Sequence, residues 1–176
     1  MLEPQRVLER ILAWDEAVLL RVAAWKRPFV TTVLSTCTHL GGGKSLTFIG
    51  VLMLALGGSV GHQLALRLLI GAGGAALVAQ ALKRVSKRRR PNSGISGFTA
   101  LVENPDAFSF PSGHTAATVG TAVAWAAMGD SLGPVMATFA AAVGFSRVYL
   151  GAHYPLDVAA GALIGLLCGG LARLVC

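Results

Sequence analysis

Apolar residues occur along the chain in runs that short polar segments separate. The runs occupy residues 29–40, 45–60, 63–82, 115–129, 132–150 and 156–174. A helix needs about 20 residues to span a bilayer, and shorter runs suit tilted helices or thin membranes. Many Gly and Ala residues line these runs, and small residues let membrane helices pack closely. The pattern predicts an all-α polytopic membrane helix bundle with about six transmembrane helices.

The N-terminal segment has a different pattern. In residues 4–25, apolar and charged positions alternate at helical spacing. One broad helical face collects Val7, Leu8, Ile11, Leu12, Val18, Leu19 and Val22. We therefore expect residues 1–27 to form an amphipathic helix that lies at the membrane interface and does not span the bilayer.

The composition supports a membrane protein and limits its partners. Of the 176 residues, 54% are hydrophobic and 13% are charged, whereas soluble domains carry about 25% charged residues. A net charge of +7 is compatible with a nucleic-acid partner, but the apolar runs argue against one. Basic residues of membrane proteins commonly face anionic lipid headgroups or lie in cytoplasmic loops. The length suits a single integral-membrane domain over residues 1–176, with membrane lipids as partners.

A polar stretch at 83–114 interrupts the apolar runs and begins with a cluster of cations. If the preceding helix continues into this stretch, Lys83 and Arg90 are separated by close to two turns and point the same way. Pro91 would then end the helix. The cations expected to face elsewhere and contact lipid headgroups are Arg84, Lys87, Arg88 and Arg89. A basic cluster of this kind is also typical of a topology signal.

The stretch "FPSGHT" at 110–115 comes directly before the fourth apolar run. Pro-Ser-Gly fits a turn, and Ser112 is predicted to cap the helix that follows. The backbone N–H groups around Gly113 would then point out of a helix N-terminus, which is a binding site for anions. His114 can donate or accept a proton there near neutral pH, although a structural role is the alternative.

The stretch "SRVYLGAHYPLD" at 146–157 joins the fifth apolar run to the sixth. Asp157 can accept a hydrogen bond from one nitrogen of His153 and leave the other nitrogen free as a nucleophile. Arg147 could instead reach for the interface, and Asp157 could serve only the helix dipole. Because successive helices alternate in direction, all three stretches fall on one side of the bundle. Ionisable residues at membrane depth are costly and usually functional.

Together the three stretches resemble the signature motifs of the type-2 phosphatidic acid phosphatase superfamily. The matching segments are "K-x6-R-P" from Lys83 to Pro91, "P-S-G-H" from Pro111 to His114, and "S-R-x5-H-x3-D" from Ser146 to Asp157. The resemblance implies that the phosphate is held by Lys83, Arg90, Ser112, Gly113 and Arg147. It implies that the catalytic residues are His153 as the nucleophile, Asp157 as its orienting carboxylate and His114 as the acid for the leaving oxygen.

The resemblance implies an integral-membrane phosphatase that removes the terminal phosphate of a lipid phosphate or a polyprenyl diphosphate through a phosphohistidine. We expect no cofactor and no metal, because residues 83–114 offer only Glu103 and Asp106 and no set of ligands for a hard cation. The alternative is a non-enzymatic membrane protein that binds anionic lipid through its basic loop. The identity of the lipid and the oligomeric state stay open at this point.

The family also implies a multi-pass protein of a bacterial inner membrane with its active site facing outward. With the N-terminus inside, three spans would separate the N-terminal segment from residues 83–90. The basic residues of these two segments are therefore expected on opposite sides of the membrane. Their numbers on the two sides are nearly equal, so charge alone does not predict the orientation.

Overall fold

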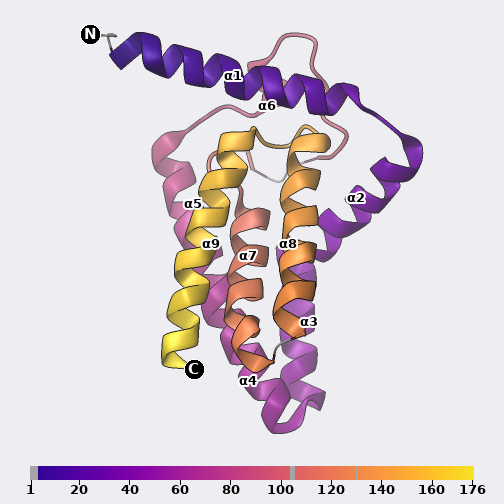
Figure 1. Ribbon diagram of the computed structural model, residues 1–176, viewed down its shortest axis with the longest axis vertical. Coiled ribbons are helices and arrows are strands. Elements are labelled where there is room, and N and C mark those ends of the chain that lie inside the picture. Colours follow the sequence, from indigo (N-terminus) through magenta and orange to yellow (C-terminus); the bar gives the residue numbers. More distant parts are fainter. Residues whose placement is uncertain (1–3, 104–105, 130) are drawn as a thin grey trace.

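The computed structural model describes residues 4–103, 106–129 and 131–176, and it is a bundle of helices with no β-strand among these residues (Figure 1). The helices are α1 (Pro4–Ala24), α2 (Pro28–Leu40), α3 (Gly43–Leu56), α4 (Gly58–Leu68), α5 (Gly74–Ser86), α6 (Pro91–Gly94), α7 (Gly113–Trp125), α8 (Leu132–Tyr149) and α9 (Pro155–Val175). A π-helical turn, η1 (Leu69–Gly73), joins α4 to α5, and a 3₁₀ turn, η2 (Ala126–Met128), follows α7. The predicted all-α class is confirmed.

Small residues set the distance between α7, in the middle of the bundle, and α9. Glycines recur every four residues along α9, at Gly161, Gly165 and Gly169. A Cβ atom at Gly165 would lie 2.6 Å from the carbonyl oxygen of Ala116, and one at Gly169 would lie 2.6 Å from that of Gly120. The two backbones are therefore in the close contact that small residues permit in membrane bundles. This contact fixes the start of α9 beside the start of α7, where two of the three motifs lie.

Two helices among the described residues are long and apolar enough to cross a membrane. The first runs continuously through α4, η1 and α5 over 29 residues, and the second is α9 with 21 residues. Helices α2 and α3 meet the same requirement only together, with a bend of 54° between them. Exposed side chains such as Leu77 and Leu174, which are 75% and 85% exposed, give the bundle the apolar outer surface that lipid contact requires.

The predicted boundary between the second and third apolar runs is wrong. The sequence places one helix at 45–60 and the next at 63–82, whereas α3 ends at Leu56 and α4 begins at Gly58. Gly58 has a φ angle of 55°, a left-handed conformation that glycine adopts without steric cost. The chain therefore reverses direction at Gly57 and Gly58, which a hydropathy pattern does not reveal because both flanking segments are apolar.

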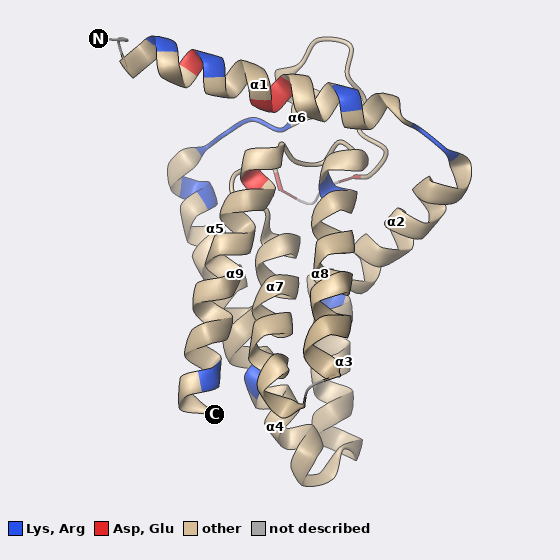
Figure 2. Ribbon diagram, viewed as in Figure 1, with Lys and Arg blue, Asp and Glu red and all other residues tan. Residues whose placement is uncertain are grey.

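One end of the bundle carries the three motifs and most of the charge. The end of α5, the start of α7, the end of α8 and the start of α9 meet there, as the alternating directions predicted (Figure 1). Helix α1 lies across the same end, where Lys and Arg residues gather (Figure 2). The prediction that α1 and residues 83–90 lie on opposite sides is therefore wrong. The reason is that α2 and α3 run in the same general direction, so they separate the two segments by one span fewer than expected (Figure 1).

Candidate active site

Lys83 and Arg90 converge as predicted, but by a different path. Helix α5 ends at Ser86, and Lys87 has a φ angle of 48° in the left-handed region. Arg90 follows in extended backbone directly before α6, so the predicted continuous helix from residue 83 to residue 90 is wrong. Both side chains are nevertheless buried, each at 5% exposure. A turn outside the helix, and not a shared helical face, brings the two cations together.

Asp106 joins the two cations. Its Oδ2 accepts a hydrogen bond from Lys83 Nζ at 2.7 Å, its Oδ1 accepts one from Arg90 Nη2, and its backbone oxygen accepts one from Arg90 Nε at 2.8 Å. Burial raises the pKa of Asp106, but Lys83 and Arg90 outweigh it and hold that pKa below its ordinary value. The carboxylate is therefore ionised at neutral pH. It contacts the same two cations that the sequence assigns to phosphate.

The prediction made for Arg88, another member of the cationic cluster, is also wrong. The sequence predicts that it contacts lipid headgroups, but it is half-buried and donates to Asp157 Oδ1 and to Asp15 Oδ2, each at 2.7 Å. Its guanidinium also lies over the ring of Tyr154, 4.1 Å from the centroid. The neighbours Arg84, Lys87 and Arg89 are exposed, and their contact with lipid headgroups stays a prediction.

The second motif lies at the start of α7. Ser112 occupies the N-cap position, but its hydroxyl makes no capping bond to the backbone and instead shares a hydrogen bond of 2.9 Å with Thr115 Oγ1. The predicted capping role of that hydroxyl is therefore wrong. A Cβ atom at Gly113 would meet no atom within 4 Å, so open space lies in front of the first turn of α7. The turn can accept an anion there, because the first backbone N–H groups of a helix have no partner within it.

The third motif supplies Arg147, His153 and Asp157. Arg147 is buried on the last turn of α8, and its Nη1 donates to Thr38 Oγ1 at 2.8 Å. His153 and Asp157 are buried at 1% and 0% exposure. Nδ1 of His153 lies 3.6 Å from Asp157 Oδ2, and Tyr154 N donates to the same oxygen at 2.9 Å. The histidine and the carboxylate thus lie close together at the start of α9 as predicted, but the predicted hydrogen bond between them is not formed at this distance.

The orientation of the His153 ring follows from its other nitrogen. Nε2 lies 3.2 Å from Arg90 Nη1, and a guanidinium can only donate hydrogen bonds. Nε2 therefore presents its lone pair, and Nδ1 carries the proton toward Asp157. Burial, together with the charges of Arg147, Arg90 and Lys83, holds the pKa of His153 well below its ordinary value. The ring is neutral, and the lone pair of Nε2 faces the guanidinium of Arg90 in the cationic part of the site.

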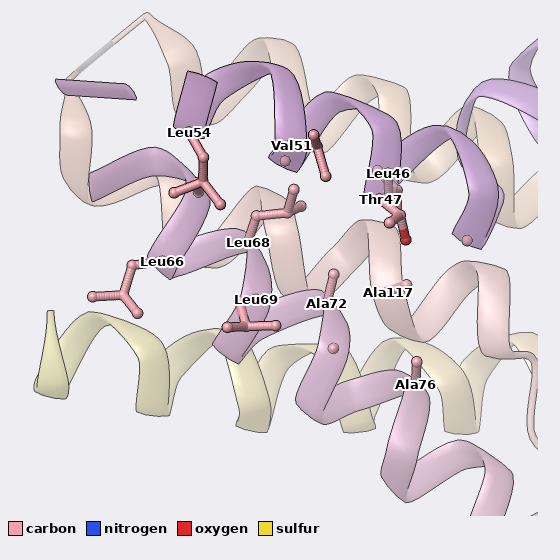
Figure 3. A pocket seen from close by; sticks show the side chains of 14 residues that line it. Leu46, Thr47, Val51, Leu54, Leu66, Leu68, Leu69, Ala72, Ala76 and Ala117 are labelled. Carbon is pink, nitrogen blue, oxygen red and sulfur yellow. The ribbon is translucent and has the colours of Figure 1, made fainter. Parts of the chain in front are cut away.

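Two neighbouring cavities share part of their lining close to the start of α7. A cavity of about 160 Å³ is lined by Lys83, Asp106, Gly113 and His114, among others. A larger, apolar cavity of about 350 Å³ lies between α3 on one side and α4 and α5 on the other, with leucines along its walls (Figure 3). The two cavities share Gly43, Ala76 and Ala117. A molecule with a polar end and an apolar chain can therefore extend from one cavity into the other.

Known proteins share this architecture and sequence. The profile of the PAP2 superfamily matches residues 64–175, and the chain belongs to that superfamily. It is accordingly a membrane-located hydrolase that acts on phosphate esters. The decaprenylphosphoryl-5-phosphoribose phosphatase of Mycobacterium tuberculosis is 32% identical over 170 residues, which cover 93% of this chain and 91% of that protein. The phosphatidylglycerophosphatase B of Bacillus subtilis is 30% identical over 168 residues, 87% of this chain and 78% of that protein.

Solved structures also resemble the fold, and two of them illustrate the similarity to the chain. The transmembrane PAP2-type phosphatidylglycerolphosphate phosphatase of Bacillus subtilis superimposes with a TM-score of 0.76 at 27% identity, covering 93% of this chain and 85% of that one. LpxE of Aquifex aeolicus gives a TM-score of 0.72 at 23% identity, covering 89% of this chain and 92% of that one. The second likeness concerns the fold alone.

Among the described residues, sequence reasoning missed several that contact the motif side chains, namely Thr38, Arg88, Asp106 and Ser109, and it missed Asp15, which contacts Arg88. Asp106 lies within the polar stretch, and an acidic residue that follows a cluster of cations was an available signal. Asp15 and Thr38 come from α1 and α2, far from the motifs in the sequence, and no local pattern indicates their contacts. Within the part of the chain that the structure describes, no group of three or more His, Cys, Asp or Glu side chains could hold a metal ion.

Proposed function

We propose that the protein removes the terminal phosphate from a lipid phosphate or a polyprenyl diphosphate through a phosphohistidine on His153. One observation carries this proposal. The lone pair of His153 Nε2 faces Arg90 at 3.2 Å, in a buried site that also contains Lys83 and Arg147. Phosphoryl transfer depends mainly on positioning and on neutralising charge, and fixed buried cations supply both. The cations hold the phosphate oxygens while the neutral imidazole is free to attack.

In the first step, Nε2 of His153 forms a bond to phosphorus as the bond between phosphorus and the lipid oxygen breaks. Lys83, Arg90 and Arg147 bind the phosphate oxygens, with the hydroxyl of Ser112 and the backbone N–H of Gly113 as further donors. His114 gives its proton to the leaving oxygen. Asp157 stabilises the positive charge that develops on the His153 ring and keeps the Nδ1 proton in place.

In the second step, water attacks the phosphohistidine. His114, now neutral, takes a proton from the water as the new bond between oxygen and phosphorus forms. The bond between phosphorus and Nε2 breaks, phosphate leaves, and His153 returns to its neutral state. We expect the reaction to need no metal ion, because Lys83, Arg90 and Arg147 neutralise the negative charge of the phosphoryl group that is transferred.

The adjoining cavities support a lipid substrate. The phosphate occupies the polar cavity beside Lys83 and His114, and the apolar chain extends along the leucine-lined cavity between α3 and α4 (Figure 3). The relatives named above act on decaprenylphosphoryl-5-phosphoribose and phosphatidylglycerophosphate. Both names describe a phosphate carried on an apolar anchor, which is the class of substrate proposed here.

We infer a multi-pass protein of a bacterial inner membrane, formed by a single domain over residues 1–176 with its active-site loop region at 83–114. The six predicted membrane helices make five crossings, because α2 and α3 form one bent span. Helix α1 lies at the interface on the side of the site, where its exposed Val7, Leu8 and Ile11 meet the headgroup region.

The distribution of charge supports one orientation of the site in the membrane. The basic residues of α1 and of residues 83–90 lie at the same end (Figure 2), and an excess of Lys and Arg marks the cytoplasmic side. We therefore favour a cytoplasmic site over the outward one predicted from the family. Cys176 is exposed at the opposite end of the bundle. In a variant with Cys37 and Cys168 replaced by Ala, an impermeant maleimide should label Cys176 in intact cells, and an unlabelled Cys176 would support the outward site.

Phosphate release from a panel of lipid phosphates in neutral detergent tests the activity. The panel contains phosphatidate, phosphatidylglycerophosphate, a polyprenyl diphosphate and a soluble aryl phosphate, each with and without excess chelator. The wild type should release phosphate with chelator present, and His153→Ala should release none. His62→Ala is the matched control, since His62 is exposed. Activity in His153→Ala would overturn the proposed nucleophile, and binding without release by the wild type would favour the non-enzymatic alternative.

A further inference from the structure

Helix α1 carries a carboxylate that is fully buried at the active-site end. Asp15 is 0% exposed, and acidic side chains are almost never fully buried unless they are paired. Its Oδ2 accepts a hydrogen bond from Arg88 at 2.7 Å, and its Oδ1 accepts one from the backbone N–H of Leu156 at 2.8 Å. Asp15 therefore contacts the catalytic motif from two sides, through the residue before Asp157 in the chain and through the arginine that binds Asp157.

Arg88 completes a chain of contacts from α1 to the proposed nucleophile. One nitrogen of its guanidinium donates to Asp15 and another donates to Asp157, both at 2.7 Å. The ring of Tyr154 covers its face. Burial lowers the pKa of Arg88, but the charges of Asp157 and Asp15 outweigh it and raise that pKa above its ordinary value. A cation that touches two carboxylates fixes their separation as well as their charge.

These contacts determine how Asp157 faces His153. Oδ1 of Asp157 is held by Arg88, and Oδ2 is held by the backbone N–H of Tyr154 at 2.9 Å. With both oxygens fixed, the carboxylate cannot rotate away from Nδ1 of His153, which lies 3.6 Å from Oδ2. An orienting group is effective only when its own position is fixed by further contacts.

We propose that Arg88 and Asp15 are positioning residues for the phosphatase reaction, through which α1 holds Asp157 against the nucleophilic His153. The inference rests on the proposed function of His153 as the nucleophile and of Asp157 as its orienting carboxylate. Arg88 acts directly on the Asp157 carboxylate. Asp15 acts through Arg88 and through the first turn of α9. The N-terminal helix is thus part of the catalytic apparatus as well as a segment at the membrane surface.

A purely structural role would give a different result from a positioning role. If the contacts only fasten α1 to the bundle, their loss lowers thermal stability and the yield of folded protein, but the folded molecules keep their turnover number. If they position Asp157, the folded molecules lose kcat while KM for phosphate esters changes little, because neither residue contacts phosphate. Losing the alignment of a reacting group by about 1 Å can cost on the order of 100-fold in rate.

The experiment measures kcat, KM and the melting temperature of Arg88→Lys and Asp15→Asn on a soluble aryl phosphate in detergent. Lysine keeps the charge of Arg88 but lacks the rigid planar fork whose two nitrogens donate to the two carboxylates. We expect kcat of Arg88→Lys to fall about 10–100-fold with KM within about 2-fold of the wild type. Asp15→Asn should show a smaller loss of kcat. The matched controls are Arg89→Lys and Glu16→Gln, which change exposed neighbours and should retain wild-type kcat.

The double variant Arg88→Lys/Asp15→Asn distinguishes the two roles further. Because both residues act through Asp157, its loss of kcat should not exceed that of Arg88→Lys by more than about 2-fold. Wild-type kcat in folded Arg88→Lys, or a loss confined to KM or to melting temperature, would overturn the inference while His153→Ala remains inactive. Activity in His153→Ala would instead overturn the proposed function itself.

Discussion

Replacing Asp106 by Asn should tighten the binding of inorganic phosphate to the site. The Asp106 carboxylate contacts Lys83 and Arg90, the two cations that are proposed to hold phosphate, and a bound phosphate must take over these contacts. Asparagine has nearly the same shape but no charge. The substitution therefore removes a competitor for the two cations and leaves their positions unchanged to a first approximation.

The magnitude follows from how deeply the pairs are buried. Exposed ion pairs contribute about 0.2–1 kcal/mol, whereas breaking a buried pair costs about 3–5 kcal/mol. The side chain of Asp106 is 32% exposed and that of Lys83 is 7% exposed, so the contacts that phosphate displaces fall between these limits, at about 1–2 kcal/mol. The inhibition constant of phosphate should then fall about 5–30-fold, because 1.4 kcal/mol corresponds to a factor of ten.

The assay is competitive inhibition of aryl phosphate hydrolysis by inorganic phosphate, in detergent at pH 7. The pKa of Asp106 lies below its ordinary value, so the wild-type carboxylate is charged throughout the assay. Glu103→Gln is the matched control, since Glu103 is an exposed carboxylate of the same loop and should leave the inhibition constant unchanged. A weaker phosphate inhibition in Asp106→Asn would refute the reasoning, because it would mean that the carboxylate organises the cations for phosphate instead of competing with it.

Three further predictions concern the acid, the nucleophile and the helix packing. His114→Ala should keep measurable turnover of an activated aryl phosphate but lose about 10²–10⁴-fold on an alkyl lipid phosphate, and comparing the two substrates checks this; equal losses on both would contradict the acid role. Because burial and the charges of Arg147, Arg90 and Lys83 depress the pKa of His153, its neutral form persists below the ordinary histidine value. A profile of kcat/KM against pH should therefore stay level as the pH falls through about 6.5, and an acidic limb centred at or above that value would argue against this nucleophile. Gly165→Leu should destabilise the bundle by more than about 1–3 kcal/mol, because even a Cβ atom would lie 2.6 Å from the carbonyl oxygen of Ala116; thermal melting against Gly170→Leu, where a Cβ atom meets nothing within 4 Å, measures the difference.

The hydropathy pattern predicted the last three helices well, and it failed where a break lies inside continuous apolar sequence. The runs at 115–129, 132–150 and 156–174 correspond to α7 with η2, to α8 and to α9, because polar loops bound each of them. No polar loop separates α3 from α4 at the reversal at Gly57 and Gly58, so the hydropathy pattern gave the boundary of these helices incorrectly. A second error had a larger consequence. The sequence treats the runs at 29–40 and 45–60 as two spans, whereas α2 and α3 run in the same general direction (Figure 1), and the number of crossings before residue 83 decides on which side α1 lies.

The motifs predicted which residues meet in the site, whereas the contacts that hold them could not be predicted. Lys83 and Arg90 converge although Lys87 leaves the helix in a left-handed conformation, which is uncommon for a residue other than glycine and has no signal in a run of basic residues. The burial of Arg88 depends on Asp15 and Asp157, 73 and 69 residues away in the sequence. Helical periodicity describes only near neighbours along the chain, so it assigned this arginine to the membrane surface.

Arg88 and Arg90 are expected to have different roles because the carboxylates that they contact differ in exposure. Asp15 and Asp157 are both 0% exposed, and losing Arg88 would leave two buried negative charges close together, which is strongly unfavourable. Arg88 is therefore committed to these carboxylates and is not available to phosphate. Asp106 is 32% exposed, so water can solvate its carboxylate when it leaves Arg90. If the proposed function holds, we expect substrate binding to open the pairs at Asp106 and to leave those at Arg88 intact, so that His153 stays aligned when the phosphate arrives.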